Sequence, residues 1–116
     1  MHELALANQI VDIVVQAGKD YGAEKILSAS VVVGRLMAVE VDNLQFALNA
    51  LKDQFSATST TDFIITEEPV QVVCGKCGST TQLEDWVFVC AVCGANDVKV
   101  VAGDSMMVLD IDIADD

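Results

Sequence analysis

Four cysteines carry the clearest chemistry in this 116-residue sequence. Cys74 and Cys77 form one Cys-x-x-Cys pair, and Cys90 and Cys93 form a second pair after twelve intervening residues. This spacing is typical of a site in which four thiolates hold one zinc ion in a tetrahedron. A glycine follows each pair, and glycine readily adopts the positive-φ conformation that a tight metal-binding turn needs. The cysteines therefore predict a structural zinc site.

The same four ligands leave alternatives open. Four thiolates also hold iron in rubredoxin-like sites, and a Cys-x-x-Cys pair can act as a dithiol redox couple. Neither pair opens a helix within a βαβ unit, which speaks against the redox couple. Four thiolates leave no coordination position for water, which speaks against a catalytic zinc.

The N-terminal Met1-His2-Glu3 offers a second kind of metal chemistry. His2 is the only histidine in the sequence, and one peptide bond separates it from an α-amino group. The amine, the amide nitrogen of His2 and its imidazole can close fused chelate rings around one ion. Such in-plane nitrogen donors suit square-planar Ni(II) or Cu(II) better than tetrahedral zinc. The alternative is that the tripeptide is incidental, since chain ends are often poorly ordered.

Other chemistry-bearing arrangements are missing from the sequence. No glycine-rich phosphate loop is present, and the single histidine cannot complete a Ser-His-Asp or Cys-His set while all four cysteines serve a metal. We therefore expect a protein that is not an enzyme.

The composition narrows the class of partner. Apolar residues make up 53% of the chain, enough for a core, and the formal net charge is −12. So acidic a chain is unsuited to nucleic acid or to an anionic membrane, and it favours basic proteins and cations. Polar residues interrupt every apolar stretch before it could span a bilayer, and no signal peptide is recognisable. We expect a cytoplasmic protein with reduced cysteines.

Two helices are predicted from apolar periodicity. Residues 3–21 are amphipathic, with apolar lines Leu6-Ile10-Ile13-Ala17 and Leu4-Ala7-Val11-Val14 beside a wet face of Asn8, Asp12 and Gln16. The second helix is predicted to begin with Asp42 as its N-cap and Gln45 completing a capping box. Its buried stripe is expected to be Leu44, Leu48, Leu51 and Phe55.

Strands are predicted at residues 25–36, 62–68 and 107–113, where apolar residues alternate or cluster. Residues 70–73 lead directly into the first cysteine pair, after the break at Pro69. The last strand needs a sheet, and the strands it could join precede the cysteines. We therefore expect an α+β fold, with two helices packed on a small three-stranded sheet and an inserted zinc-ribbon-like lobe. The expected domains are residues 1–72 plus 102–116, and residues 73–101, the latter depending on its metal to fold.

Taken together, these features resemble the HypA/HybF family of hydrogenase nickel-incorporation proteins over essentially the whole chain. The resemblance rests on Met1-His2-Glu3 followed by Leu4, the two Cys-x-x-Cys-Gly motifs, the terminal strand, and the stretches 33–36, 41–42 and 44–47. The chain departs from the family pattern at Ala91 and Val92, where proline is frequent, and at 103–106. Neither departure affects a ligand.

The resemblance implies a nickel metallochaperone. Such a protein delivers Ni(II) to the [NiFe] hydrogenase large subunit, in partnership with a nickel-binding GTPase, and in some organisms also serves urease. The implied nickel site is the amine of Met1, the amide and imidazole of His2, and Glu3 through its backbone nitrogen or as a flanking contact. The implied zinc ligands are Cys74, Cys77, Cys90 and Cys93. The rival hypothesis is a zinc-stabilised protein-protein adaptor with no direct nickel role.

Overall fold

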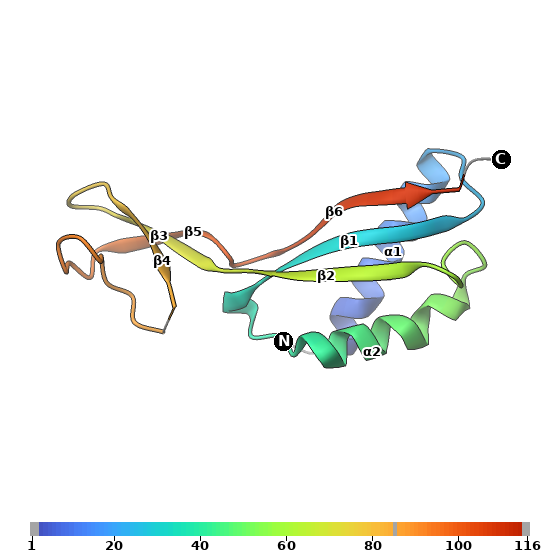
Figure 1. Ribbon diagram of the computed structural model, residues 1–116, viewed down its shortest axis with the longest axis horizontal. Helices are drawn as coiled ribbons and strands as arrows, with labels where there is room; N and C mark the ends of the chain where they lie inside the picture. The colour runs from blue at the N-terminus through green and yellow to red at the C-terminus, as the bar shows by residue number, and fades with distance from the viewer. Residues whose placement is uncertain (1–2, 85, 115–116) are drawn as a thin grey trace. The chain divides into compact units, whose positions relative to one another are not determined.

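The computed structural model describes residues 3–84 and 86–114. These residues form two α-helices, two short 3₁₀ helices and six β-strands (Figure 1). The helices are α1 (Glu3–Asp20), η1 (Arg35–Met37), α2 (Val41–Leu51) and η2 (Lys52–Gln54). The strands are β1 (Ile26–Gly34), β2 (Asp62–Glu68), β3 (Val70–Cys74), β4 (Thr80–Leu83), β5 (Val98–Ala102) and β6 (Met106–Ile113). Within this described part, neither α-helix has the length and apolar content that crossing a bilayer requires.

The chain divides into two compact units. The first unit comprises residues 1–32, 39–66 and 106–116, and the second comprises 33–38 and 67–105. These bounds differ from the expected domain limits, because residues 33–38, 67–72 and 102–105 group with the cysteines. For residues 67–72 the physical reason is Pro69, which has no N–H to continue a strand ladder. The chain therefore changes sheets there, with β2 ending at Glu68 and β3 beginning at Val70.

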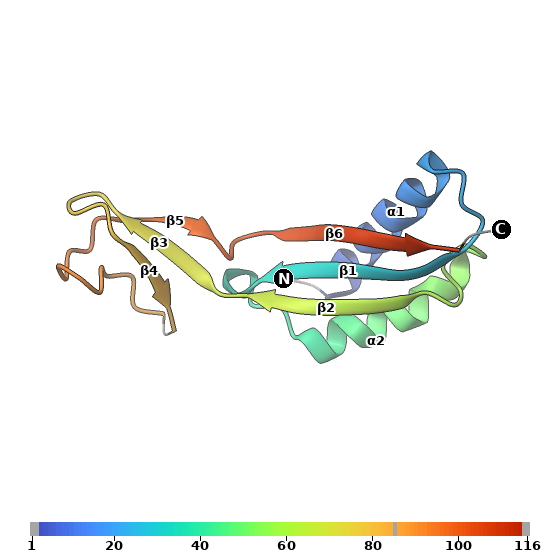
Figure 2. The same ribbon diagram turned by 45° about the horizontal axis from the view of Figure 1, so that its top comes forward.

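Among the described residues of the first unit, three strands form a sheet with the order β2-β1-β6, and the helices pack on it. Both helices cover one face of this sheet, and α1 contacts α2 and β6 (Figures 1 and 2). The expected α+β architecture is confirmed. The largest fully buried apolar side chains come from both helices and β1, and they include Leu6, Ile10, Val14, Ile26, Val31, Leu44 and Leu48.

Helix α1 ends one residue before its predicted limit at Tyr21, and its apolar surface is wider than the area that its packing partners cover. Leu6, Ile10 and Val14 are buried as expected, and the wet face is exposed. Ile13, predicted to lie in the core, is 44% exposed, and Leu4 is similarly open. Helix α2 and the sheet thus cover only part of the apolar surface of α1.

The predicted start of α2 is wrong by two residues, because the N-cap is Glu40 and not Asp42. The helix begins at Val41 with Glu40 as N-cap, and Glu40 makes no side-chain capping bond. Asp42 therefore lies in the first turn, where its charge complements the helix dipole. Gln45 donates to Asn49 instead of reaching back to complete a capping box.

The unused cap position leads to a stability prediction. We expect Glu40→Ser to raise the free energy of unfolding by roughly 0.5–1 kcal/mol, because a serine hydroxyl can accept from the free N–H groups of the first turn. Urea unfolding measures this. Glu24→Ser removes the same charge from an exposed loop residue and should leave the midpoint nearly unchanged. Equal effects of the two substitutions would show that relief of net charge, not capping, is responsible.

The second unit contains a separate antiparallel sheet with the order β4-β3-β5, again counting the described strands alone. Val70 pairs with Leu83, and Cys74 pairs with Val98. Val70, Val72 and Leu83 form its buried cluster, with Leu36, Val98 and Val100 packed against it. Trp86, Phe88 and Val89, which follow β4, lie outside this cluster and are exposed. Strand β3 supplies most of the core, and Trp86 is 57% exposed.

Two glycines allow backbone segments of the second unit to touch. A Cβ on Gly34 would collide with the carbonyl of Gly103, and a Cβ on Gly103 would lie 2.5 Å from the carbonyl oxygen of Pro69. The amide of Leu36 donates to that same Gly103 carbonyl at 2.9 Å. The Gly103 amide donates to a carboxylate oxygen of Glu68 at 2.8 Å. This close approach connects η1 and the segment after β5 to the start of β3.

Candidate metal centre

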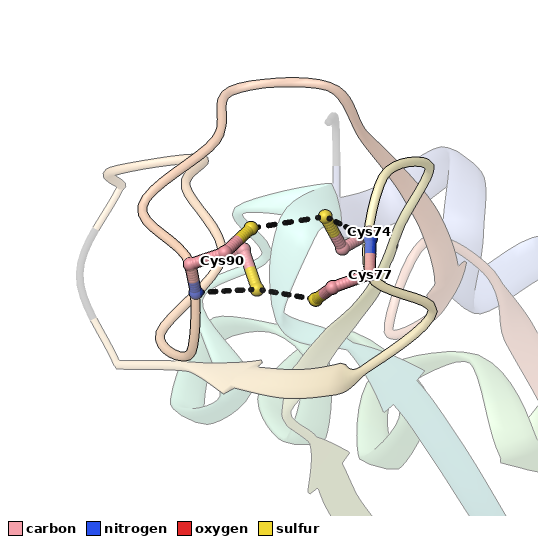
Figure 3. A group of neighbouring side chains, drawn as sticks. Cys74, Cys77 and Cys90 are labelled. Atoms are coloured by element: carbon pink, nitrogen blue, oxygen red, sulfur yellow. Dashed lines mark hydrogen bonds between the residues drawn. The ribbon is translucent and has the colours of Figure 1, made fainter.

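The fold brings the four cysteine sulfurs together. Cys74 ends β3, and the other three cysteines lie in the turns that follow β3 and precede β5. The Sγ atoms of Cys74 and Cys93 are 3.6 Å apart, and those of Cys77 and Cys90 are 3.5 Å apart (Figure 3). All four sulfurs lie within 4.8 Å of one another. A zinc tetrahedron with bonds of about 2.3 Å requires sulfurs about 3.8 Å apart, so this donor set fits the ion.

Disulfide bonding does not account for this arrangement. A disulfide needs its sulfurs about 2.05 Å apart, and all four cysteines are free thiols. Cys74 and Cys90 are buried, whereas Cys77 and Cys93 are exposed. Each turn therefore contains one buried and one exposed cysteine.

The two cysteine turns repeat the same backbone geometry. In the first turn, the amides of Lys76 and Cys77 point at the Cys74 sulfur, each at 3.4 Å. In the second, the amides of Val92 and Cys93 point at the Cys90 sulfur at 3.4 and 3.5 Å. The glycines that follow, Gly78 and Gly94, have φ values of 75° and 74°, as the sequence predicted. Such N–H donors stabilise thiolate over thiol.

Hydrogen bonds also cross between the two turns. The amide of Gly75 donates to the carbonyl oxygen of Asp97 at 2.7 Å. The amide of Ala91 donates to the hydroxyl oxygen of Thr81 at 3.1 Å. Thr81 and Asp97 are separated in sequence by the same interval as Cys74 and Cys90, so the two bonds are related by the pseudo-symmetry of the turns. Sequence reasoning missed both residues, although this interval was the available signal.

The hydrogen bonds favour ionised sulfurs at three positions. The amides of Cys77 and Lys76 lower the pKa of Cys74, and the amide of Cys93 lowers the pKa of Cys90. The hydroxyl and amide of Ser79 lower the pKa of Cys77. The amide of Ala95 also acts to lower the pKa of Cys93, but the Cys74 sulfur and burial outweigh it and raise this pKa to about 12. A cation must therefore balance the charge for all four thiolates to coexist.

Of the three predicted nickel ligands, the structure describes Glu3 alone. Met1 and His2 lie outside the described residues, whereas Glu3 is the first residue of α1 and is half-buried. Over residues 3–84 and 86–114, the four cysteines form the one cluster of three or more His, Cys, Asp or Glu side chains whose donor atoms converge. The acidic side chains of that part of the chain do not gather into a second such cluster.

Comparison with known proteins decides the family. Residues 1–113 match the HypA family model, described as hydrogenase/urease nickel incorporation, metallochaperone. The chain belongs to the HypA family. It is 32% identical to the hydrogenase maturation factor HypA of Chlorobaculum tepidum, over 93% of this chain and 95% of that protein. It is 31% identical to HypA of Rhizobium leguminosarum bv. viciae, over 97% of this chain and 99% of that one.

HypA structures share the fold. The solution structure of the Ni metallochaperone HypA from Helicobacter pylori superposes with a TM-score of 0.75 at 20% identity, covering 97% of each chain. The resemblance read from the sequence is thus confirmed. HypA proteins are metallochaperones rather than enzymes, and their role is nickel incorporation during hydrogenase or urease maturation.

Proposed function

We propose that this chain binds Ni(II) through Met1, His2 and Glu3 and delivers it to the [NiFe] hydrogenase large subunit. Membership of the HypA family is the observation that carries the proposal. The donor set agrees with it, because His2 is the only histidine in the sequence. An amine, an amide nitrogen and an imidazole together suit square-planar nickel.

The proposed nickel site has features of a site that releases its ion to an acceptor. A helix N-terminus carries a partial positive charge that disfavours a bound cation. The Glu3 carboxylate, in the first turn of α1, offsets part of that charge. A chelate built mainly from the chain end has few protein ligands, so an acceptor can approach the ion from the open side. Such a site suits transfer better than storage.

The proposed zinc site is structural and consists of Cys74, Cys77, Cys90 and Cys93. Four converging sulfurs with N–H donors around them support zinc, and four thiolates leave no position for a reacting water. Metal analysis should give one zinc per chain in a colourless protein. A red protein containing iron would indicate a rubredoxin-like site instead.

The proposed partners follow from the family role. They are the nickel-binding GTPase of the maturation pathway, the hydrogenase large subunit and, in some organisms, the urease machinery. Nucleic acid and anionic membranes are not proposed partners, because the net charge of −12 on this chain is repelled by their negative charge. We place the protein in the cytoplasm, where four thiols stay reduced.

Nickel titration tests the proposal. We expect the zinc-loaded protein to bind one Ni(II) with a square-planar absorption band. His2→Ala should weaken binding by more than the roughly 10–100-fold that loss of an outer-shell partner costs. Acetylation of the α-amino group should have a similar effect. Affinity should also fall as the pH is lowered, because protons compete for the amine and the imidazole.

Controls separate the proposal from the adaptor hypothesis. Gln9→Ala changes an exposed residue of α1 and should bind nickel like the parent protein. Radiolabelled nickel should pass from the loaded protein to the purified apo large subunit, but not from the His2→Ala protein. If His2→Ala binds and transfers nickel normally, the N-terminal site is wrong, and a zinc-stabilised adaptor becomes the better account.

A further inference from the structure

An apolar groove lies between α1 and β6 in the first unit. Its volume is about 450 Å³, and it is lined by Ile13, Ala17, Tyr21, Val108, Leu109, Asp110, Ile111 and Ile113. Ile13, Tyr21 and Leu109 are 44%, 76% and 60% exposed. Large apolar side chains gathered around one open groove are unusual for a surface without a partner.

The strand beside the groove has a free edge. β6 is the outer strand of the β2-β1-β6 sheet, so among the described strands it has a neighbour on one side alone. An outer strand presents unpaired N–H and C=O groups that a further strand can use. An extended segment of another protein can therefore pair with β6 while its side chains enter the groove.

The alternation of residue types along β6 indicates the chemistry of that segment. Ile111 and Ile113 are half-buried, whereas Asp110 and Asp112, at the alternate positions, are exposed, and Asp110 also lines the groove. No Lys or Arg lines the groove. A pairing strand would therefore place apolar side chains beside the isoleucines and basic side chains beside the aspartates, and both kinds of cross-strand pair are favourable.

A second copy of this chain is a poorer occupant. Pairing of two β6 strands would bring Asp110 and Asp112 close to their counterparts, and like charges across strands are destabilising. Each copy also carries a net charge of −12. We propose that the α1–β6 groove binds an extended segment of another protein, with alternating apolar and basic residues, by strand addition to β6. This proposal does not depend on either metal site.

A titration with synthetic peptides tests strand addition. The probe is a blocked heptapeptide of alternating lysine and valine, and the comparison peptide has glutamate in place of each lysine. Backbone NMR should show shifts at residues 13–21 and 106–113 with the lysine peptide, and β6 amides should exchange more slowly. N-methylation of alternate peptide amides should weaken binding at least tenfold, because those amides can no longer pair with β6.

Charge variants test the acidic edge. Asp110→Lys should weaken the lysine peptide at least tenfold, whereas Asp53→Lys makes the same change of charge at an exposed η2 residue outside the groove and should have little effect. Equal effects of the two variants would overturn the proposal in favour of non-specific attraction. Absence of binding at millimolar peptide, or a stable dimer formed through β6, would also overturn it.

Discussion

Removal of zinc should unfold residues 67–105 and leave the rest of the chain folded. The second unit has a small apolar cluster, Val70, Val72 and Leu83, and ordering the backbone costs about 1–2 kcal/mol per residue. The metal must supply much of the difference, and structural zinc contributes on the order of 10–16 kcal/mol in zinc-finger peptides. The first unit has a larger core of its own. Its hydrogen-exchange protection should persist.

Cys90→Ser is the variant that tests this expectation. Exchange measured by mass spectrometry should rise throughout 67–105, while α1, β1 and α2 stay protected. Val92→Ala is the matched control, because Val92 is 71% exposed and its amide still donates to the Cys90 sulfur. Protection of 67–105 that survives metal removal would show that this unit folds without zinc. Loss of protection throughout the chain would show that the two units unfold together.

Gly103→Ala should be the most destabilising of the glycine substitutions in the second unit. Gly103 has a φ of 86°, and its new Cβ would lie 2.5 Å from the Pro69 carbonyl oxygen and 2.7 Å from the Val70 Cα. Left-handed backbone costs about 1–2 kcal/mol for a residue with a Cβ, and overpacking adds typically 1–3 kcal/mol. We therefore expect a loss of roughly 2–5 kcal/mol, measured by denaturant unfolding of the zinc-loaded protein.

Two other glycines separate the causes of this loss. Gly78 has a φ of 75° but nothing within 4 Å of its built Cβ, so Gly78→Ala should show backbone strain alone. Gly34 has a φ of −68°, yet its Cβ would collide with the Gly103 backbone, so Gly34→Ala should show the collision alone. If Gly103→Ala costs no more than Gly78→Ala, the close approach of the backbones is not important for stability.

Local patterns predicted the elements well where one residue type imposes a geometry. The strand at 62–68 was predicted at its observed bounds, because Pro69 ends the ladder. The helix at 3–20 followed from its apolar period. The cap of α2 was mispredicted, because Asp42 and Gln45 have capping chemistry but Val41 already lies in the helix.

The local geometry around the four cysteines could be predicted because each cysteine pair is contained in one short turn, so this geometry depends on few residues. The hydrogen-bond partners around the cysteines depend on residues that are far away in the sequence. Thr81 and Asp97 accept hydrogen bonds from amides of opposite turns only because β3 pairs with both β4 and β5. The N-terminal prediction stays a prediction, since Met1 and His2 are outside the described residues.

The sequence by itself determined which residues offer donor atoms for a metal at a suitable spacing, since donor chemistry and short spacings are local properties. It also determined the helix and strand periods, which reflect backbone geometry. Only the tertiary structure decided which apolar residues are buried. Ile13 has the same helical period as Ile10, but Ile10 is fully buried and Ile13 borders the α1–β6 groove. Burial depends on what packs against each side chain, and residues far away in the sequence supply those partners.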